Sequence, residues 1–285
     1  MIASILTLQQ NATSDSIHEV LPHIYASRRL LLSTFQLPQS QLDNATRAFL
    51  IGTYVYIAVV SDISKTMVEA QMSILEEATL LFPLIEGNDS FRRTYGVDVE
   101  LFRLIPKVSA LINEQHVGLD GAIVSSWETT LGHKTLRSKI SSWKSNAEDS
   151  NIIICEEIYQ QALLLYLESS LSSNNYLSDV NHLLATIQDA FNSLTVLLGR
   201  LPLESTVSTV LFWPLAIFGS CASTPDQQDI VRQRLVSLQS GFGLRHIGRI
   251  LCLLEELWAR CDIPHRGPLV LSQIMKEISL RVYFL

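Results

Sequence analysis

Apolar residues recur along most of this chain at the three- and four-residue spacing of helices. Such spacing favours amphipathic or buried helices, and we find no alternating runs bounded by turn residues, which would indicate strands. Helices are expected at about 16–37, 41–63, 64–82, 97–113, 152–171, 177–198, 211–222, 229–238, in a stretch ending at 258, and at 269–283. The pattern predicts an all-α protein.

The segments between these helices are predicted to be loops or weaker helices. Residues 85–95 and 144–151 are polar enough for surface loops, and 117–143 has helical patterning weakened by glycines. Residues 1–14 are expected to form a flexible N-terminal arm. No linker rich in Pro, Gly or Ser divides the remainder, so residues 15–285 are interpreted as a single helical domain.

The stretch from Leu211 to Ala222 is almost wholly apolar. A helix with this composition must be surrounded by protein on most sides. Pro214 is expected to bend or restart the helix, and Gly219 leaves room for a neighbouring helix or a ligand to approach the backbone. We therefore predict a large bundle of antiparallel helices around a buried central helix.

Three groups of residues carry a resemblance to a known family. They are Trp213-Pro214-Leu215 followed by Gly219-Ser220-Cys221-Ala222, then Tyr95-Gly96-Val97, and the run from Tyr159 to Leu167. Together they resemble the second type of fungal-specific transcription factor domain. The resemblance implies a helical regulatory domain that senses small metabolites, sterols among them, and controls transcription through a zinc-cluster DNA-binding module.

Charge and cysteine spacing give no sign of such a module. The net charge is −7, and the only basic pairs are 28–29 and 92–93, whereas binding to phosphates needs clustered Lys and Arg. Cys155, Cys221, Cys252 and Cys261 are too widely spaced for a zinc cluster. Since the chain starts at Met1 directly with the helical region, we expect no direct nucleic-acid binding.

The chain is expected to be intracellular, either cytoplasmic or nuclear. The N-terminus lacks a secretory signal, and the cysteines are typical of buried, reduced thiols. The longest apolar run, 48–60, is shorter than the roughly 20 residues that a membrane-spanning helix needs.

No common catalytic motif is present, so no metal and no cofactor are expected. Two residues are candidates for acid–base chemistry. Asp62 follows a mainly apolar helix, where burial can shift a carboxyl pKa, although a solvated place at the helix end explains it equally well. His246 follows the glycine break at 241–243 and can hydrogen-bond or move a proton near neutral pH; its alternative is a partly exposed place in the first turn of a helix.

Aromatic residues on several helices are expected to converge on an internal cavity. Such a cavity would hold an apolar terpenoid, sterol or polyketide by shape and a few polar anchors, although aromatics at helical spacing also form ordinary core. The candidate ligand-binding residues are Tyr54, Phe102, Tyr166, Trp213, Phe218 and Cys221.

Two functions follow from these observations, and both require a bound apolar molecule. The first is a ligand-binding regulatory domain without a DNA-binding module of its own. The second is a cofactor-independent cyclase or pericyclase of fungal natural-product biosynthesis, which would hold its substrate in a reactive conformation. A protein-interaction scaffold, for example a homodimer, is a third class, because helical bundles expose apolar grooves.

Overall fold

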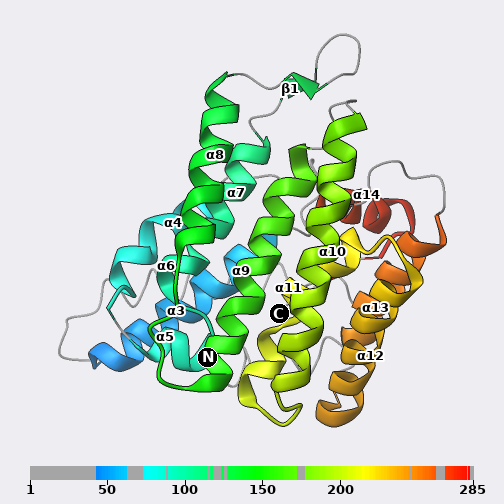
Figure 1. Cartoon of the computed structure of the whole chain (residues 1–285). Helices are drawn as coiled ribbons and strands as arrows, with labels where there is room; N and C mark the ends of the chain where they lie inside the picture. Colours follow the sequence, from blue (N-terminus) through cyan, green and yellow to red (C-terminus); the bar gives the residue numbers. More distant parts are fainter. Residues whose placement is uncertain are drawn as a thin grey trace.

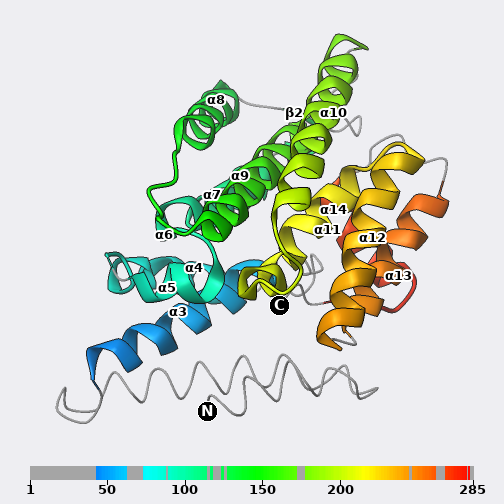
Figure 2. The ribbon, with the colours of Figure 1, turned by 60° about the horizontal axis from the view of Figure 1, so that its bottom comes forward.

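The computed structural model confirms the all-α class. It describes residues 43–62, 73–87, 89–113, 116–117, 123–124, 127–171, 177–243, 246–260, 267–280 and 282. The predicted arm at 1–14 and the predicted helix at 16–37 lie outside the described residues. Both views show α9, α10 and α11 in the middle of the molecule, with α3 to α8 on one side and α12 to α14 on the other (Figures 1 and 2).

The elements of the first half are α3 (Asn44–Val60), α4 (Ser73–Leu81), the 3-10 helix η3 (Phe82–Leu84), α5 (Asp89–Tyr95), α6 (Val99–Phe102), α7 (Leu104–Asn113), β1 (His116–Val117), β2 (Ile123–Val124) and α8 (Trp127–Ser142). Those of the second half are α9 (Ser150–Leu171), α10 (Leu177–Arg200), the 3-10 helix η4 (Thr206–Val210), α11 (Phe212–Cys221), α12 (Pro225–Phe242), α13 (His246–Ala259) and α14 (Pro268–Glu277). None of the described helices is long and apolar enough to cross a membrane.

Helix α11 corresponds to the apolar stretch singled out in the sequence. All ten of its residues are buried, and it packs against α9, α12, α13 and α14. Pro214 is the third residue of α11. It starts this helix rather than bending it, because the first turn of a helix does not use its N–H groups in the helical ladder.

Polar side chains fix where two helices begin. Asp43 caps α3 by accepting a hydrogen bond from the Thr46 amide at 2.8 Å. Thr224 and Gln227 form a capping box at the start of α12, which fixes the first turn of this helix. The same helix ends at Gly243, whose φ of 66° lies in the left-handed region that glycine adopts without strain.

Three local predictions were wrong. Residues 89–95 form α5 instead of a loop, because the acid at its start and the arginines at its end suit the helix dipole. The expected helix over 97–113 is divided at Arg103 into α6 and α7, and Pro106 again occupies a first turn. In the range 117–143 the helix starts only at Trp127, after a short antiparallel pair that joins β1 to β2. Two-residue strands are too short to produce an alternating pattern.

Candidate functional site

Trp213 lies in an aromatic cluster between α9 and α11. Its ring stacks on Tyr159, with centroids 5.8 Å apart and planes 10° apart, and Tyr166 meets it edge-on at 6.2 Å. Trp213 has no exposed surface, and its indole Nε1 has no hydrogen-bond partner among the described residues. A buried N–H without an acceptor costs about 1–3 kcal/mol, so this donor is a candidate contact for a bound molecule.

Asp62 is connected to this cluster through Ser109. The Ser109 hydroxyl donates to Asp62 Oδ2 at 2.5 Å, and it also bonds the Tyr166 hydroxyl. Burial raises the pKa of Tyr166, and the Asp62 charge adds to the shift. The residues after α3, together with α7, α9 and α11, thus bring Asp62, Tyr166 and Trp213 into one connected group, in which the Asp62 carboxylate accepts a hydrogen bond.

Phe102 belongs to the same aromatic core, through residues that the sequence analysis missed. Tyr56 stacks between Tyr95, at 4.2 Å, and Phe102, at 5.5 Å. Phe102 also meets Tyr159 at 6.5 Å. The Tyr159 hydroxyl donates to the Val210 carbonyl at 2.7 Å and lies 3.4 Å from the Tyr56 hydroxyl. The seven-residue spacing of Tyr159 and Tyr166, two helical turns, is a signal that could have placed Tyr159 in the site.

The remaining candidate residues make their described contacts elsewhere. The Tyr54 hydroxyl donates to Glu77 at 3.4 Å, and Phe218 packs edge-on against Phe191 of α10 at 5.3 Å. Burial raises the pKa of the Cys221 thiol to about 11, so this thiol is not a ready nucleophile. His246 opens α13, but the role predicted for it depends on a side chain outside the described part of the structure.

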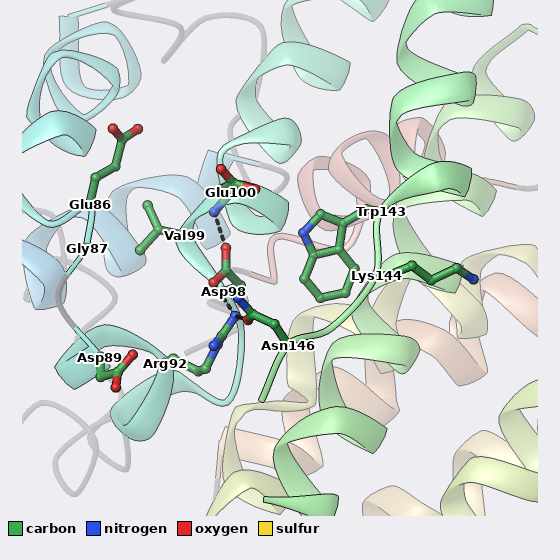
Figure 3. Close-up of a pocket in the computed structure, with 10 residues that line it drawn as sticks. All are labelled: Glu86, Gly87, Asp89, Arg92, Asp98, Val99, Glu100, Trp143, Lys144 and Asn146. Atoms are coloured by element: carbon green, nitrogen blue, oxygen red, sulfur yellow. Dashed lines mark hydrogen bonds and ion pairs between the residues drawn. The ribbon is translucent and has the colours of Figure 1, made fainter. Parts of the chain in front are cut away.

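A second candidate site is a pocket of about 340 Å³ on the surface. It lies between α5, the start of α6 and the segment that follows α8 (Figure 3). Its lining residues are Glu86, Gly87, Asp89, Arg92, Asp98, Val99, Glu100, Trp143, Lys144 and Asn146. The pocket shares no residue with the cluster around Trp213, and sequence analysis did not predict it.

Arg92 organises the wall of this pocket. Its guanidinium forms an ion pair with Asp98 and donates to Asn146 Oδ1 at 2.5 Å (Figure 3). Arg92 Nε also lies 2.9 Å from Oε1 of Glu156, whose side chain is fully buried. This contact is an ion pair. The Ser145 hydroxyl donates to the other carboxylate oxygen of Glu156.

Burial determines the protonation behaviour of Glu156. Desolvation raises its pKa, although Ser145 and Arg92 act in the opposite direction. Most charges around the pocket are already paired within the protein, so its geometry indicates a structural junction between α5, α6 and α9. Among the described residues, no group of three His, Cys, Asp or Glu side chains is arranged to hold a metal ion.

Comparison with known proteins decides the family. The model of the fungal specific transcription factor domain matches residues 1–275. The chain belongs to this family. The resemblance found in the motifs around Trp213, Gly96 and Tyr159 is therefore confirmed.

One curated relative is the trichothecene biosynthesis transcription regulator TRI10 of Fusarium sporotrichioides. The chain is 29% identical to it over 126 residues, which are 44% of this chain. The matched segment spans only 28% of the relative's length. No solved structure matches the chain.

Proposed function

We propose that this chain is a regulatory domain that controls transcription of biosynthetic genes in a fungus. The observation that carries the proposal is the family match over residues 1–275. The relative named as a regulator of trichothecene biosynthesis supports a role in secondary metabolism. With a net charge of −7, the domain would act through protein partners rather than by contacting DNA phosphates.

Deletion of the gene, followed by transcript profiling and metabolite analysis, tests this role. We expect transcripts of a biosynthetic gene set to fall together with their product, and a wild-type copy to restore both. Loss of a product with unchanged transcripts would contradict regulation and would support the cyclase hypothesis instead. The two functions are therefore separated in one experiment.

We also propose that the domain responds to an apolar molecule that carries one hydrogen-bond acceptor. The support is the cluster around Trp213, where two tyrosine rings pack against an indole whose N–H lacks an acceptor among the described residues. A carbonyl or ether oxygen would satisfy this donor, and the rings would contact the apolar body. Tyr166, Ser109 and Asp62 form a polar chain beside the cluster.

Native mass spectrometry of the full chain with farnesol or ergosterol tests the ligand proposal. If one of them binds, Trp213→Phe should weaken its retention about tenfold, the value of one lost hydrogen bond. Trp127→Phe is the matched control, because Trp127 is 71% exposed. Equal retention by wild type and Trp213→Phe would overturn the assignment of this donor.

The described contacts add nothing that favours the cyclase over the regulator. Asp62 already accepts a hydrogen bond from Ser109, and the role of His246 depends on a side chain that is not described. The cyclase hypothesis therefore stays a prediction from the sequence, and transcriptional regulation is the function that we propose.

A further inference from the structure

Helix α8 presents two large apolar side chains to solvent. The helix lies at the rim of the molecule in both views (Figures 1 and 2) and packs against α7 and α9. Trp127 is 71% exposed and Leu131 is 54% exposed. Residues four apart lie on the same face of a helix, so the two side chains form one apolar patch on the outer face of α8.

Three lysines lie on α8 and on the neighbouring helix α7. Lys134 follows Leu131 by three residues and shares its face; Lys139 lies further along α8. The two helices α7 and α8 approach so closely that a Cβ at Gly132 would lie 2.9 Å from Leu111 Cδ1. Lys107 lies one turn before Leu111 on α7 and is exposed. Partial burial lowers the pKa of Lys107, and the charges of Lys139 and Arg103 add to this effect.

These lysines lack the partners that neutralise the neighbouring arginines. Arg103 pairs with Glu86 at 2.5 Å, and Arg137 pairs with Glu168 at 2.8 Å. Within the described part of the chain, no carboxylate pairs with Lys107, Lys134 or Lys139. A protein with a net charge of −7 thus carries three lysines without carboxylate partners on α7 and on α8, the helix that exposes Trp127 and Leu131.

We propose that this surface, formed by Trp127, Leu131, Lys134, Lys107 and Lys139 and called the α8 face below, docks an acidic amphipathic helix of a partner protein. Apolar residues of the partner, one turn apart, would contact Trp127 and Leu131. Its Asp and Glu residues would complement the three lysines. At 16 residues, α8 offers a face about 24 Å long, enough for several turns of a partner helix.

The composition of the α8 face favours a protein over other anionic partners. The sugar-phosphate backbone of DNA offers Trp127 and Leu131 only the small apolar surfaces of its sugars. An anionic membrane would attract the few lysines but would repel a protein with an overall charge of −7. An acidic helix supplies both kinds of contact over a small area, where the distant negative charges are screened.

Fluorescence anisotropy with the full chain tests the proposal. The probe is a labelled helical peptide of about 16 residues, with leucines spaced three and four apart and Glu or Asp on both flanks. A scrambled peptide and a lysine-substituted peptide serve as comparisons. We expect saturable binding of the acidic peptide that weakens with salt, and about tenfold or greater loss with Lys107→Glu/Lys139→Glu or with Trp127→Ala/Leu131→Ala.

Two controls keep the proposal falsifiable. Lys276→Glu changes an exposed lysine on α14 and should leave binding unchanged, while circular dichroism verifies that each variant folds. The lysine-substituted peptide should bind the Lys107→Glu/Lys139→Glu variant more tightly than it binds the wild-type protein. Equal binding by wild type and the α8-face variants, or stronger binding of wild type to duplex DNA or phosphatidylserine vesicles, would overturn the assignment. The gene-deletion test of transcription is independent of this outcome.

Discussion

The indole Nε1 of Trp258 donates a hydrogen bond to the carbonyl oxygen of Gly219 at 2.8 Å. One turn before Trp258, Leu254 packs against the same glycine, where a Cβ would lie 2.6 Å from Leu254 Cδ1. Residue 219 is therefore the point at which α13 meets the backbone of α11. The prediction that Gly219 admits a close neighbour holds, and the neighbour is a helix of the same chain.

Gly219→Ala should destabilise the protein by about 1–3 kcal/mol through overpacking. Leu254 is fully buried and cannot move away without disturbing its surroundings. Chemical denaturation measures the change. Gly241→Ala in α12 is the matched control, because no atom lies within 4 Å of its added Cβ; it should be neutral or stabilising, as alanine favours helix. The idea fails if the two alanines have equal effects.

Gly96→Ala should lower the free energy of unfolding by more than the strained backbone conformation alone explains. Gly96 has a φ of +62°, and its Cβ would lie 2.9 Å from both Cys155 Sγ and Val207 Cγ1. We expect a loss of about 1–2 kcal/mol from the left-handed conformation and about 1–3 kcal/mol more from the clash. Gly87→Ala isolates the first contribution, since Gly87 has a φ of +73° and nothing within 4 Å. Similar unfolding midpoints for both variants would contradict this account.

Glu156→Gln should change how stability depends on pH. The folded pKa of Glu156 is raised by burial above its ordinary value of 4.5, so the native state holds this proton more tightly than the unfolded chain does. The resulting stabilisation is fully present below about pH 4.5 and is lost as pH rises through the folded pKa. Wild type should therefore lose stability relative to Glu156→Gln as the pH is raised toward neutrality.

Urea denaturation across this pH range measures the difference for Glu156→Gln. The same substitution at Glu157, the next residue of α9, serves as the control because it lies outside the pairing with Arg92 and Ser145. A wild-type curve parallel to that of Glu156→Gln at every pH would show that the carboxyl does not titrate differently on folding.

Arg234→Met should loosen the turn between α10 and η4. Both Nη atoms of this buried arginine donate to the Leu201 carbonyl at 3.3 Å, and Nη2 donates to the Ser208 hydroxyl at 3.1 Å. Methionine keeps much of the packing but leaves the carbonyl without these donors, at about 1–3 kcal/mol. Hydrogen exchange at residues 201–210 should accelerate. Arg200→Met, at an exposed position, should leave the exchange there unchanged.

Sequence periodicity could predict most of the helices because a long helix such as α10 buries a recognisable apolar stripe or, like α11, an entirely apolar surface. It could not predict α5, whose stability depends on tertiary contacts of Phe91 and Tyr95 as well as on terminal charges. Nor could it predict the division at Arg103, since the apolar spacing continues across the break. Short elements leave too few residues to establish a period.

The sequence allowed only part of the candidate site to be predicted. Trp213, Tyr166 and Asp62 were recognisable from residue type and surroundings, and the structure connects them. The intermediary Ser109 was not, because a serine at a helical position carries no signal of its own. The pairing of Arg92 with Glu156 joins residues on different helices, and a single sequence contains no information on that contact.

The complete burial of α11 would limit how fast a small molecule can enter or leave the cluster around Trp213. Trp213 has no exposed surface, so the proposed effector can reach it only when the helices packed against α11 move apart. Displacements of packed helices are far slower than diffusion of a small molecule. Entry and exit of the proposed effector would therefore be limited by the opening of the bundle rather than by diffusion of the molecule.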